Sequence, residues 1–290
     1  MTAVKPNSAA ANRRNAKRRT LSVTGVFAVA ILLLWVLVAL FGPFLAPHNE
    51  ADIVSDGNFT RPSAEYLLGT DYIGRDVFSR LIYGARTTLA TGLIATLIAE
   101  CLGIYLGLFA AIRGGIVDSV MSRLNDALLS FPHIMMGLVV IAALGSSIPV
   151  LIATSGFVYA SAVYRIARAL AMELREKEFI EAARARGEGT WWVLSREILP
   201  NTTLPLLTDF ALRLSFIILF MSSLGFLGLG VQPPTADWGS MVRENMEGLG
   251  SGSLAPIIPA AAIASITVAL NLLVDELSMR TGRIYGGARE

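Results

Sequence analysis

The sequence predicts an all-α membrane protein with six transmembrane helices. Of its 290 residues, 54% are hydrophobic and only 16% are charged, whereas soluble domains typically carry about 25% charged residues. Several long stretches contain no Asp, Glu, Lys or Arg, and a helix needs about 20 apolar residues to cross the hydrocarbon core of a bilayer. These observations disfavour a soluble globular enzyme.

Counting the apolar stretches gives the six spans. Residues 21–47 carry no charge, and their apolar part exceeds the roughly 7–15 residues of a cleaved signal peptide, so we expect a retained anchor. The second stretch is interrupted only by Glu100. The uncharged run of residues 127–164 is long enough for two helices, joined where Gly145 and Pro149 interrupt the pattern. The other spans are predicted in residues 87–112, 214–236 and 248–274.

The basic residues set the orientation of these spans. Cytoplasmic connections are enriched in Lys and Arg, and placing the N-terminal tail in the cytoplasm puts 19 of the 24 basic residues on that side. Six spans then return the C-terminus to the cytoplasm. The chain is thus divided into a tail, an anchor, an outer loop, a core of five spans with an inner loop, and a second tail. These segments are residues 1–20, 21–47, 48–86, 87–277 (inner loop 168–205) and 278–290.

The second half of the outer loop, residues 69–86, has apolar side chains at helical spacing with charged side chains between them. This pattern predicts a helix that lies on the membrane surface with its apolar side down. An ordinary amphipathic connector would show the same spacing. The apolar positions are Ile73, Val77, Phe78, Leu81 and Ile82.

The inner loop mixes acidic and basic residues in a pattern that predicts a charged helix. Such a helix is often a solvated surface, but the small pair Ala182-Ala183 would allow the backbone of a partner to approach closely. Gly187 is expected to end this helix, and Pro200 would permit a new one to begin. From the pattern alone, a docking helix and a plain loop both remain open.

These inner-loop residues resemble a known signature. Glu181, Ala182 and Ala183, followed by Gly187 and the pair Leu199-Pro200, have the spacing of the EAA motif in the permease subunits of bacterial ABC importers. Glu197 stands where that motif has Ile. Three other segments are similar to the C-type permeases of the oligopeptide, dipeptide and nickel group. They are residues 67–86, 118–132 and 226–241.

The resemblance implies a type I ABC importer permease fold in the bacterial inner membrane. It also implies that the inner-loop helix is a coupling helix, which docks into a groove of a cytoplasmic ATPase. Glu181 would make charged contacts, Ala182 and Ala183 would permit close seating, and Gly187 would form the turn. The residues expected at this interface are Glu178, Phe179, Glu181, Ala182, Ala183, Arg184, Gly187, Leu199 and Pro200.

The same resemblance implies the partners. They are a second permease that completes the pathway, two ATP-binding subunits, and an external solute-binding protein that meets the outer loop and residues 231–249. The cargo would be a small peptide or a related solute such as a nickel chelate or glutathione. The chain has no Gly-Lys dipeptide and therefore no phosphate-binding P-loop. We expect no cofactor, metal, catalytic residue or nucleic acid in this chain, with ATP and magnesium bound by the partner subunits.

Three residues carry competing interpretations. Glu100 in the second span could line the substrate path or lie at a helix interface, because an ionisable group at this depth avoids lipid. His133 and Ser130 could suggest an intramembrane protease, but the two residues lie on one element, and a packed histidine is expected.

Gly103 and Gly107 form a GxxxG pattern, which predicts tight helix packing within the bundle. The main alternative function is a secondary transporter driven by an ion gradient. It would show inverted repeats and midplane carboxylates, whereas the chain shows no convincing repeat and Glu100 is its only obvious central acid. A membrane enzyme would need a nucleophile and base that we do not find.

Overall fold

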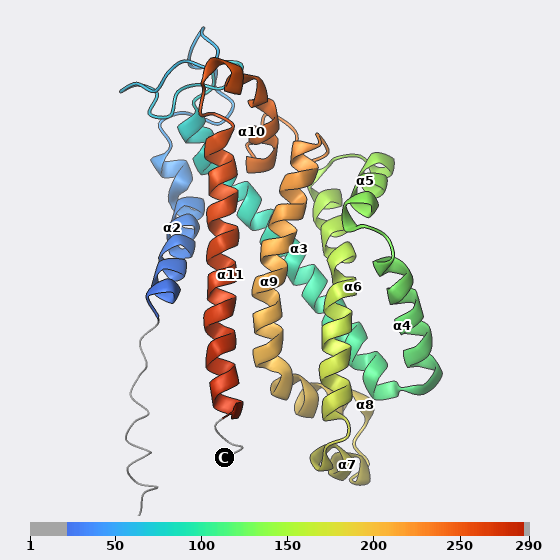
Figure 1. The fold of residues 1–290 in the computed structure, drawn as a ribbon. Coiled ribbons are helices and arrows are strands. Elements are labelled where there is room, and N and C mark those ends of the chain that lie inside the picture. Colours follow the sequence, from blue (N-terminus) through green and yellow to red (C-terminus); the bar gives the residue numbers. More distant parts are fainter. Residues whose placement is uncertain (1–21, 287–290) are drawn as a thin grey trace, which may run out of the picture.

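The computed structural model describes residues 22–286, with side chains placed up to residue 278. This part of the chain is helical and contains no strand beyond two isolated bridges in the first loop, which confirms the predicted all-α class (Figure 1). The predicted tail of residues 1–20 and the last four residues lie outside the described part. The elements are α2 (Val23–Leu45), α3 (Val77–Arg113), α4 (Gly115–Leu129), α5 (His133–Leu144), α6 (Ile148–Leu174), α7 (Glu178–Ala185), α8 (Thr190–Trp192), the π-helix η1 (Val193–Ile198), α9 (Leu199–Phe226), α10 (Trp238–Glu244), the 3-10 helix η2 (Met246–Ser251) and α11 (Ile257–Gly286).

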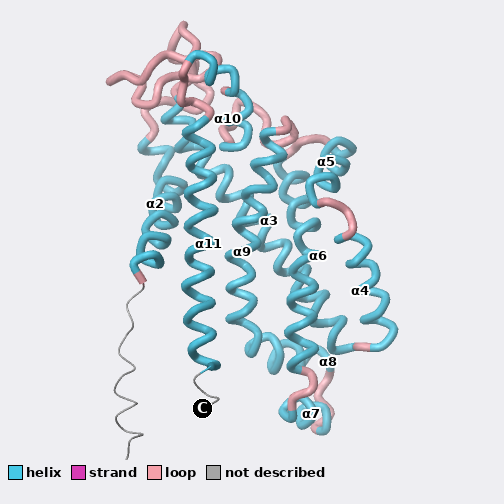
Figure 2. The backbone as a smooth tube through the Cα atoms, in the orientation of Figure 1, coloured by secondary structure: helices cyan, strands magenta, loops and turns pink. Residues whose placement is uncertain are grey.

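The helices form an elongated bundle whose two ends differ. Figure 2 shows loops gathered at the end that carries α10, at the break between α4 and α5, and around α7 at the opposite end. We call these the α10 end and the α7 end. Along the chain, α2 runs away from the α7 end and α11 runs toward it. Because α11 continues to Gly286, most of the segment expected as a C-terminal tail extends this last helix.

Five continuous helical stretches among residues 22–286 are long and apolar enough to cross a membrane, and the bent pair α4 and α5 would make a sixth. The third predicted span is therefore not one straight helix, because α4 and α5 meet at an angle of 85°. The break falls at Pro132, which lacks a backbone N–H and restricts the residue before it. Arg168 on α6 holds α4 in place by donating two hydrogen bonds, of 2.5 and 2.7 Å, to Asp118.

The prediction of a separate surface helix in residues 69–86 is wrong. Residues 77–86 are the first turns of α3, which runs without a break for 37 residues. Asp76 caps this helix by accepting hydrogen bonds from the backbone N–H groups of Phe78 and Ser79. The apolar positions Val77 and Ile82 are buried against protein, so the amphipathic pattern reflects contact with α2 and α10 instead of contact with lipid.

The fifth span also differs from its prediction. Its helix runs from Thr190 to Phe226, through α8, η1 and α9, whereas the sequence predicted residues 214–236 with a new helix beginning near Pro200. Proline is tolerated at the start of α9 because η1 precedes it with π-type bonding. As a consequence, Asp209 and Arg213 lie inside the span.

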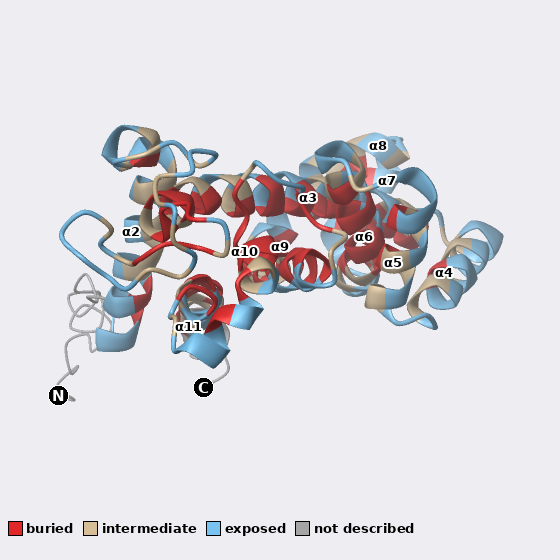
Figure 3. Cartoon of the chain, turned by 90° about the horizontal axis from the view of Figure 1, so that it is seen from above, coloured by how far each residue is buried: buried red, intermediate tan, exposed pale blue. Residues whose placement is uncertain are grey.

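The packing of the bundle is built on α3, which crosses diagonally behind α11, α9 and α6 (Figure 1). The closest approach is to α6, where a Cβ added at Gly103 would lie 2.5 Å from the Cβ of Val163, and one at Gly107 would lie 2.6 Å from the carbonyl oxygen of Tyr164. The predicted tight packing at this GxxxG pattern is confirmed. Figure 3 shows the buried residues concentrated on α3, α6 and α9, with α2 and α4 more exposed.

An ionic network closes the α10 end. Arg75 donates to Asp71 at 2.6 Å and to Glu244 at 2.8 Å, and Arg80 donates to the same Glu244 oxygen at 2.9 Å. All four side chains are at most 10% exposed. The network joins the first loop and the start of α3 to the end of α10, so these segments form one surface.

We expect Gly103→Ala to destabilise the protein, because the added methyl group would meet α6 at an impossible distance. Overpacking costs about 1–3 kcal/mol, and this exceeds the roughly 1 kcal/mol that alanine gains in helix propensity. The temperature at which half of the purified protein stays monodisperse in detergent should fall. Gly250→Ala is the matched control, because no atom lies within 4 Å of the place that its added methyl group would occupy. A rise for Gly103→Ala would contradict the packing described here.

Removing the shared acid of the ionic network should be more damaging. Glu244→Ala removes the acceptor that two buried guanidinium groups share, and breaking a buried ion pair costs about 3 kcal/mol or more. The same thermal measurement in detergent should show the loss. Glu247→Ala removes an exposed acid from the next turn and should change little. Equal stability of the two variants would show that the network contributes nothing.

Candidate functional site

The inner-loop helix predicted from the sequence is α7, which lies beyond the membrane-spanning helices at the α7 end of the bundle (Figure 1). It begins at Glu178 and ends at Ala185. Gly187 follows with a φ of +83°, a left-handed conformation that glycine adopts without steric cost. The backbone N–H of Glu188 then bonds to the carbonyl of Ala183, which closes the helix as a C-terminal turn.

One face of α7 packs on its own chain. Ile180 and Ala183 are fully buried and share a hydrophobic cluster with Leu108 of α3, Ala167 of α6 and Val193 of η1. The sequence predicted that Ala183 would allow a partner to approach. Its small side chain instead lets α7 approach the ends of α3 and α6, because it has no exposed surface.

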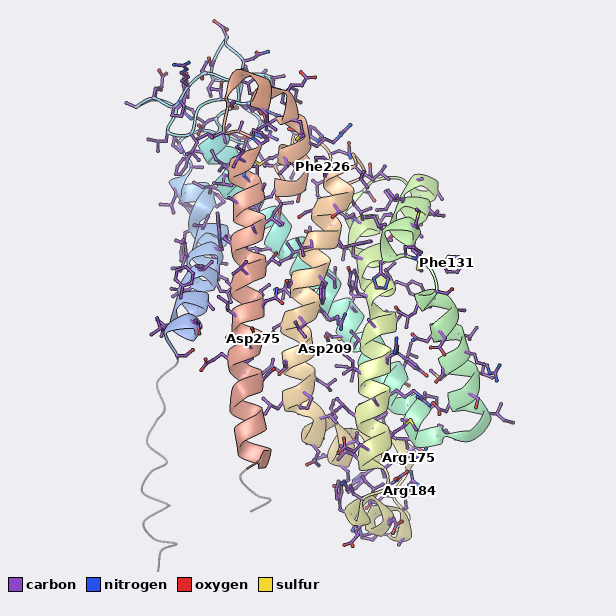
Figure 4. The ribbon with its side chains drawn as sticks, viewed as in Figure 1. Phe131, Arg175, Arg184, Asp209, Phe226 and Asp275 are labelled. Atoms are coloured by element: carbon purple, nitrogen blue, oxygen red, sulfur yellow. The ribbon has the colours of Figure 1, made fainter. Side chains whose placement is uncertain are left out.

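The other face of α7 is exposed. Its side chains carry both charges and one aromatic ring, and Phe179 keeps 39% of its surface exposed. No hydrogen bond or ion pair is found for the charged side chains of this face within the described chain. Figure 4 shows Arg184 at the far α7 end, below Arg175. The exposed members of the predicted set are Glu178, Phe179, Glu181, Ala182, Arg184, Gly187, Leu199 and Pro200.

Two arginines fix the loop on either side of α7. Arg175 donates from Nη1 to the carbonyl oxygen of Ala111 at 3.0 Å and so ties the start of the loop to the end of α3. The guanidinium of Arg186 lies 5.9 Å from the ring centre of Trp192, a cation–π contact. Together with the buried inner face, these contacts make α7 a firmly attached part of the bundle.

A second candidate site lies in the middle of the bundle. Arg213 of α9 bonds through Nε and Nη2 to Asp209, at 3.1 and 3.0 Å. Glu100 of α3 lies within electrostatic range of both. It is 5% exposed, and neither of its carboxyl oxygens has a hydrogen-bond partner in the described chain. Charges at this depth cost about 2.5–3.5 kcal/mol each on insertion scales, so such groups usually serve a function.

Two members of this cluster were missed in the sequence. Arg213 was placed outside the membrane and Asp209 was not considered, because both precede the uncharged run of residues 214–236. The signal that could have revealed them is their spacing. An acid and an arginine four residues apart lie on the same face of a helix and can neutralise each other, so this pair does not end an apolar span.

Two cavities are each lined by residues of both α6 and α9. The larger has a volume of about 740 Å³ and reaches toward α10, with aromatic walls that include Tyr159, Phe216 and Phe220. The smaller, of about 350 Å³, lies toward the α7 end and is lined by both Arg165 and Arg213. Glu100 lines neither cavity.

The structure places His133 as a packed residue. Its ring lies 5.0 Å from that of Tyr159 at the wall of the larger cavity, and the hydroxyl of Ser130 donates to the carbonyl of Ala127 at 2.7 Å. The serine is thus not activated by the histidine. Among residues 22–286, no three His, Cys, Asp or Glu side chains are grouped in a way that could hold a metal ion.

Comparisons with known proteins agree with this architecture. Residues 103–278 match the family described as the binding-protein-dependent transport system inner membrane component, and residues 18–62 match the N-terminal TM domain of oligopeptide transport permease C. The chain is 33% identical to a dipeptide transport system permease protein DppC of Alkalihalophilus pseudofirmus, over 90% of this chain and 85% of the relative.

Two further relatives cover similar lengths. A glutathione transport system permease protein GsiD of Pectobacterium atrosepticum is 32% identical, over 91% of this chain and 87% of its own. A di/tripeptide transport system permease protein DppC of Pseudomonas aeruginosa is 35% identical, over 85% and 83%. The similarity extends over nearly the whole length of each protein.

The two alanines of the inner loop should respond differently to enlargement. Ala183→Leu forces extra volume into the buried contact with α3 and α6 and should lower the free energy of unfolding by about 1–3 kcal/mol. Ala182→Leu adds the same side chain to the exposed face and should leave the thermal stability of the isolated chain unchanged. Thermal unfolding of both variants in detergent would test the assignment of the two faces, which equal losses would contradict.

Proposed function

Because the chain belongs to the family of binding-protein-dependent transport system inner membrane components, we propose that it forms one half of the translocation pathway of an ATP-driven importer. It is the non-catalytic permease component of an ABC transporter. The observation that carries the proposal is the two-sided helix α7, whose inner face is buried on α3, α6 and η1 and whose outer face is free.

This arrangement suits a coupling element. An ATPase that binds the outer face of α7 would move the ends of α3 and α6 with it, because Ile180, Ala183 and Arg175 attach the helix to them. Glu181 would supply a charged contact and Ala182 would permit close approach. Phe179 would enter an apolar pocket of the partner. Closing of the ATPase on ATP would thereby tilt the membrane helices as rigid bodies.

The orientation proposed from the basic residues fits the fold. The α7 end would lie in the cytoplasm, together with both chain termini, since α2 runs away from that end and α11 runs toward it. The α10 end would face outward from the bacterial inner membrane. The first loop and residues 231–249 would meet the solute-binding protein on this side, on the surface that the ionic network of Glu244 holds together.

The remaining partners would supply the parts of the transporter that this chain does not contain. Both cavities are open to the surroundings of the chain, and a second permease would cover them to complete the pathway. Two ATP-binding subunits would hold ATP and magnesium. The relatives are named for the transport of dipeptides, tripeptides and glutathione, so we propose small peptides or a closely related solute as the cargo.

The coupling role can be tested with charge reversal on α7. Glu181→Lys should reduce ATP hydrolysis stimulated by the binding protein, and ATP-dependent uptake into proteoliposomes, at least tenfold, because it places a cation where the partner expects an acid. Ala182→Leu should have a similar effect through steric exclusion, while the ATPase co-purifies less. Asp275→Lys, at an exposed acid of α11 away from α7 and from both outer loops, is the control for the change in charge.

Two results would overturn the proposal. One is normal coupling in both α7 variants. The other is uphill uptake by this chain alone, without a companion subunit, which would favour a transporter driven by an ion gradient. Uptake that stops on ATP depletion but continues with an uncoupler would support the importer.

A further inference from the structure

The smaller cavity is unusual because two arginines face it at the depth of the membrane. Its other lining residues are Leu129, Ala162, Ile166 and Ala169, which offer no charge. Arg213 lies 13 residues before the end of α9 at Phe226, which places it about 20 Å along the helix from that end. Figure 4 shows its partner Asp209 at mid-height on α9, well separated from Arg175 and Arg184.

The two cations differ in how they are compensated. Arg213 uses Nε and Nη2 to bind Asp209, and no hydrogen bond from its Nη1 is found in the described chain. Arg165 is exposed, and among residues 22–278 it has no ion pair or hydrogen bond. The acids near Arg213 are buried, with Asp209 at 3% and Glu100 at 5% exposure, and neither lines the cavity. The cavity therefore presents positive charge.

Arg213 also joins the two cavities. Its guanidinium lies 5.7 Å from the ring centre of Phe216, and Phe216 lines the larger aromatic cavity. Tyr159 and His133, on the wall of that larger cavity, are within electrostatic range of Arg213. A solute that leaves the aromatic cavity toward the α7 end would thus meet Arg213 first and then Arg165.

We propose that Arg213 and Arg165 form a carboxylate-binding site in the translocation pathway. This site selects solutes that carry a carboxylate. This inference rests on the proposed function as an importer permease. Guanidinium groups match carboxylates in geometry and charge, and the aromatic cavity accommodates apolar parts of the same solute. Asp209 competes with the solute carboxylate for Arg213. This competition keeps the solute bound weakly enough to move on, as conduction through any site requires.

The experiment uses the complete transporter in proteoliposomes, with the binding protein loaded beforehand with Ala-Ala or with its C-terminal amide. Arg165→Lys, Arg165→Gln and Arg165→Glu form a charge series at an exposed position that has no hydrogen bond or ion pair among the described residues. Asp209→Asn combined with Arg213→Gln removes the second cation and its acid together, so that neither member of this ion pair is left without the other. Arg86→Gln removes an exposed arginine of α3 and is the control.

We expect Ala-Ala uptake per ATP hydrolysed to fall at least fivefold in Arg165→Gln and in the double variant, and further in Arg165→Glu. Arg165→Lys should retain at least half. ATP hydrolysis stimulated by the binding protein should stay within twofold of the wild-type rate in all variants, whereas the loss of a structural contact would lower it. Uptake of the amide should fall by no more than twofold.

Equal losses of uptake for Ala-Ala and for its amide would overturn the inference. It would also be overturned if all the Arg165 variants and the double variant took up Ala-Ala as well as Arg86→Gln does. In either case, ATP-dependent uptake by the wild-type complex would leave the proposed function standing. Absence of that uptake in the wild type would instead refute the proposed function itself.

Discussion

The contact on which the rest of the structure depends is the close approach of α3 and α6 at Gly103 and Gly107. A side chain at either glycine would collide with the backbone or Cβ atoms of α6, so this approach is available only without a Cβ. Helices in a bilayer gain little from apolar burial against each other and depend on such tight packing. The contact fixes the diagonal course of α3, against which α2, α9 and α10 are then arranged.

The same pair of helices carries the inner-loop helix. Leu108 and Ala111 near the end of α3, and Ala167 and Ala171 of α6, form one cluster with Ile180 and Ala183 of α7. The cluster begins directly after the GxxxG contact along α3, so α7 is attached where the bundle is most closely packed. A displacement of α7 is therefore transmitted to α3 and α6 together, which is what a rigid-body mechanism needs.

The sequence predicted the class of fold and the apolar spans, because the hydrocarbon core demands long uncharged segments whatever their packing. It also placed the break between α5 and α6 near Gly145, but it did not predict the break at Pro132 or the continuity of α3 from residue 77. The pattern of residues 69–86 is the same for a helix on lipid and for one buried against protein, and only the contacts of Val77 and Ile82 distinguish them. The candidate site could also be predicted only in part. Gly187 indicated the end of α7, but which of the two adjacent alanines faces inward depends on the rotation of α7 about its own axis where it packs on α6.

Two sets of charged residues differ in whether the fold pairs them. Asp71, Arg75, Arg80 and Glu244 are buried and joined to one another, as the cost of burying an unpaired charge requires. The charges on the outer face of α7 are exposed and without ion pairs in the described chain, as is Arg165 in the cavity. Pairing of the first group holds this chain together. The second group adds little to folding, and its charges are free to act on a subunit or a solute that the chain itself does not contain.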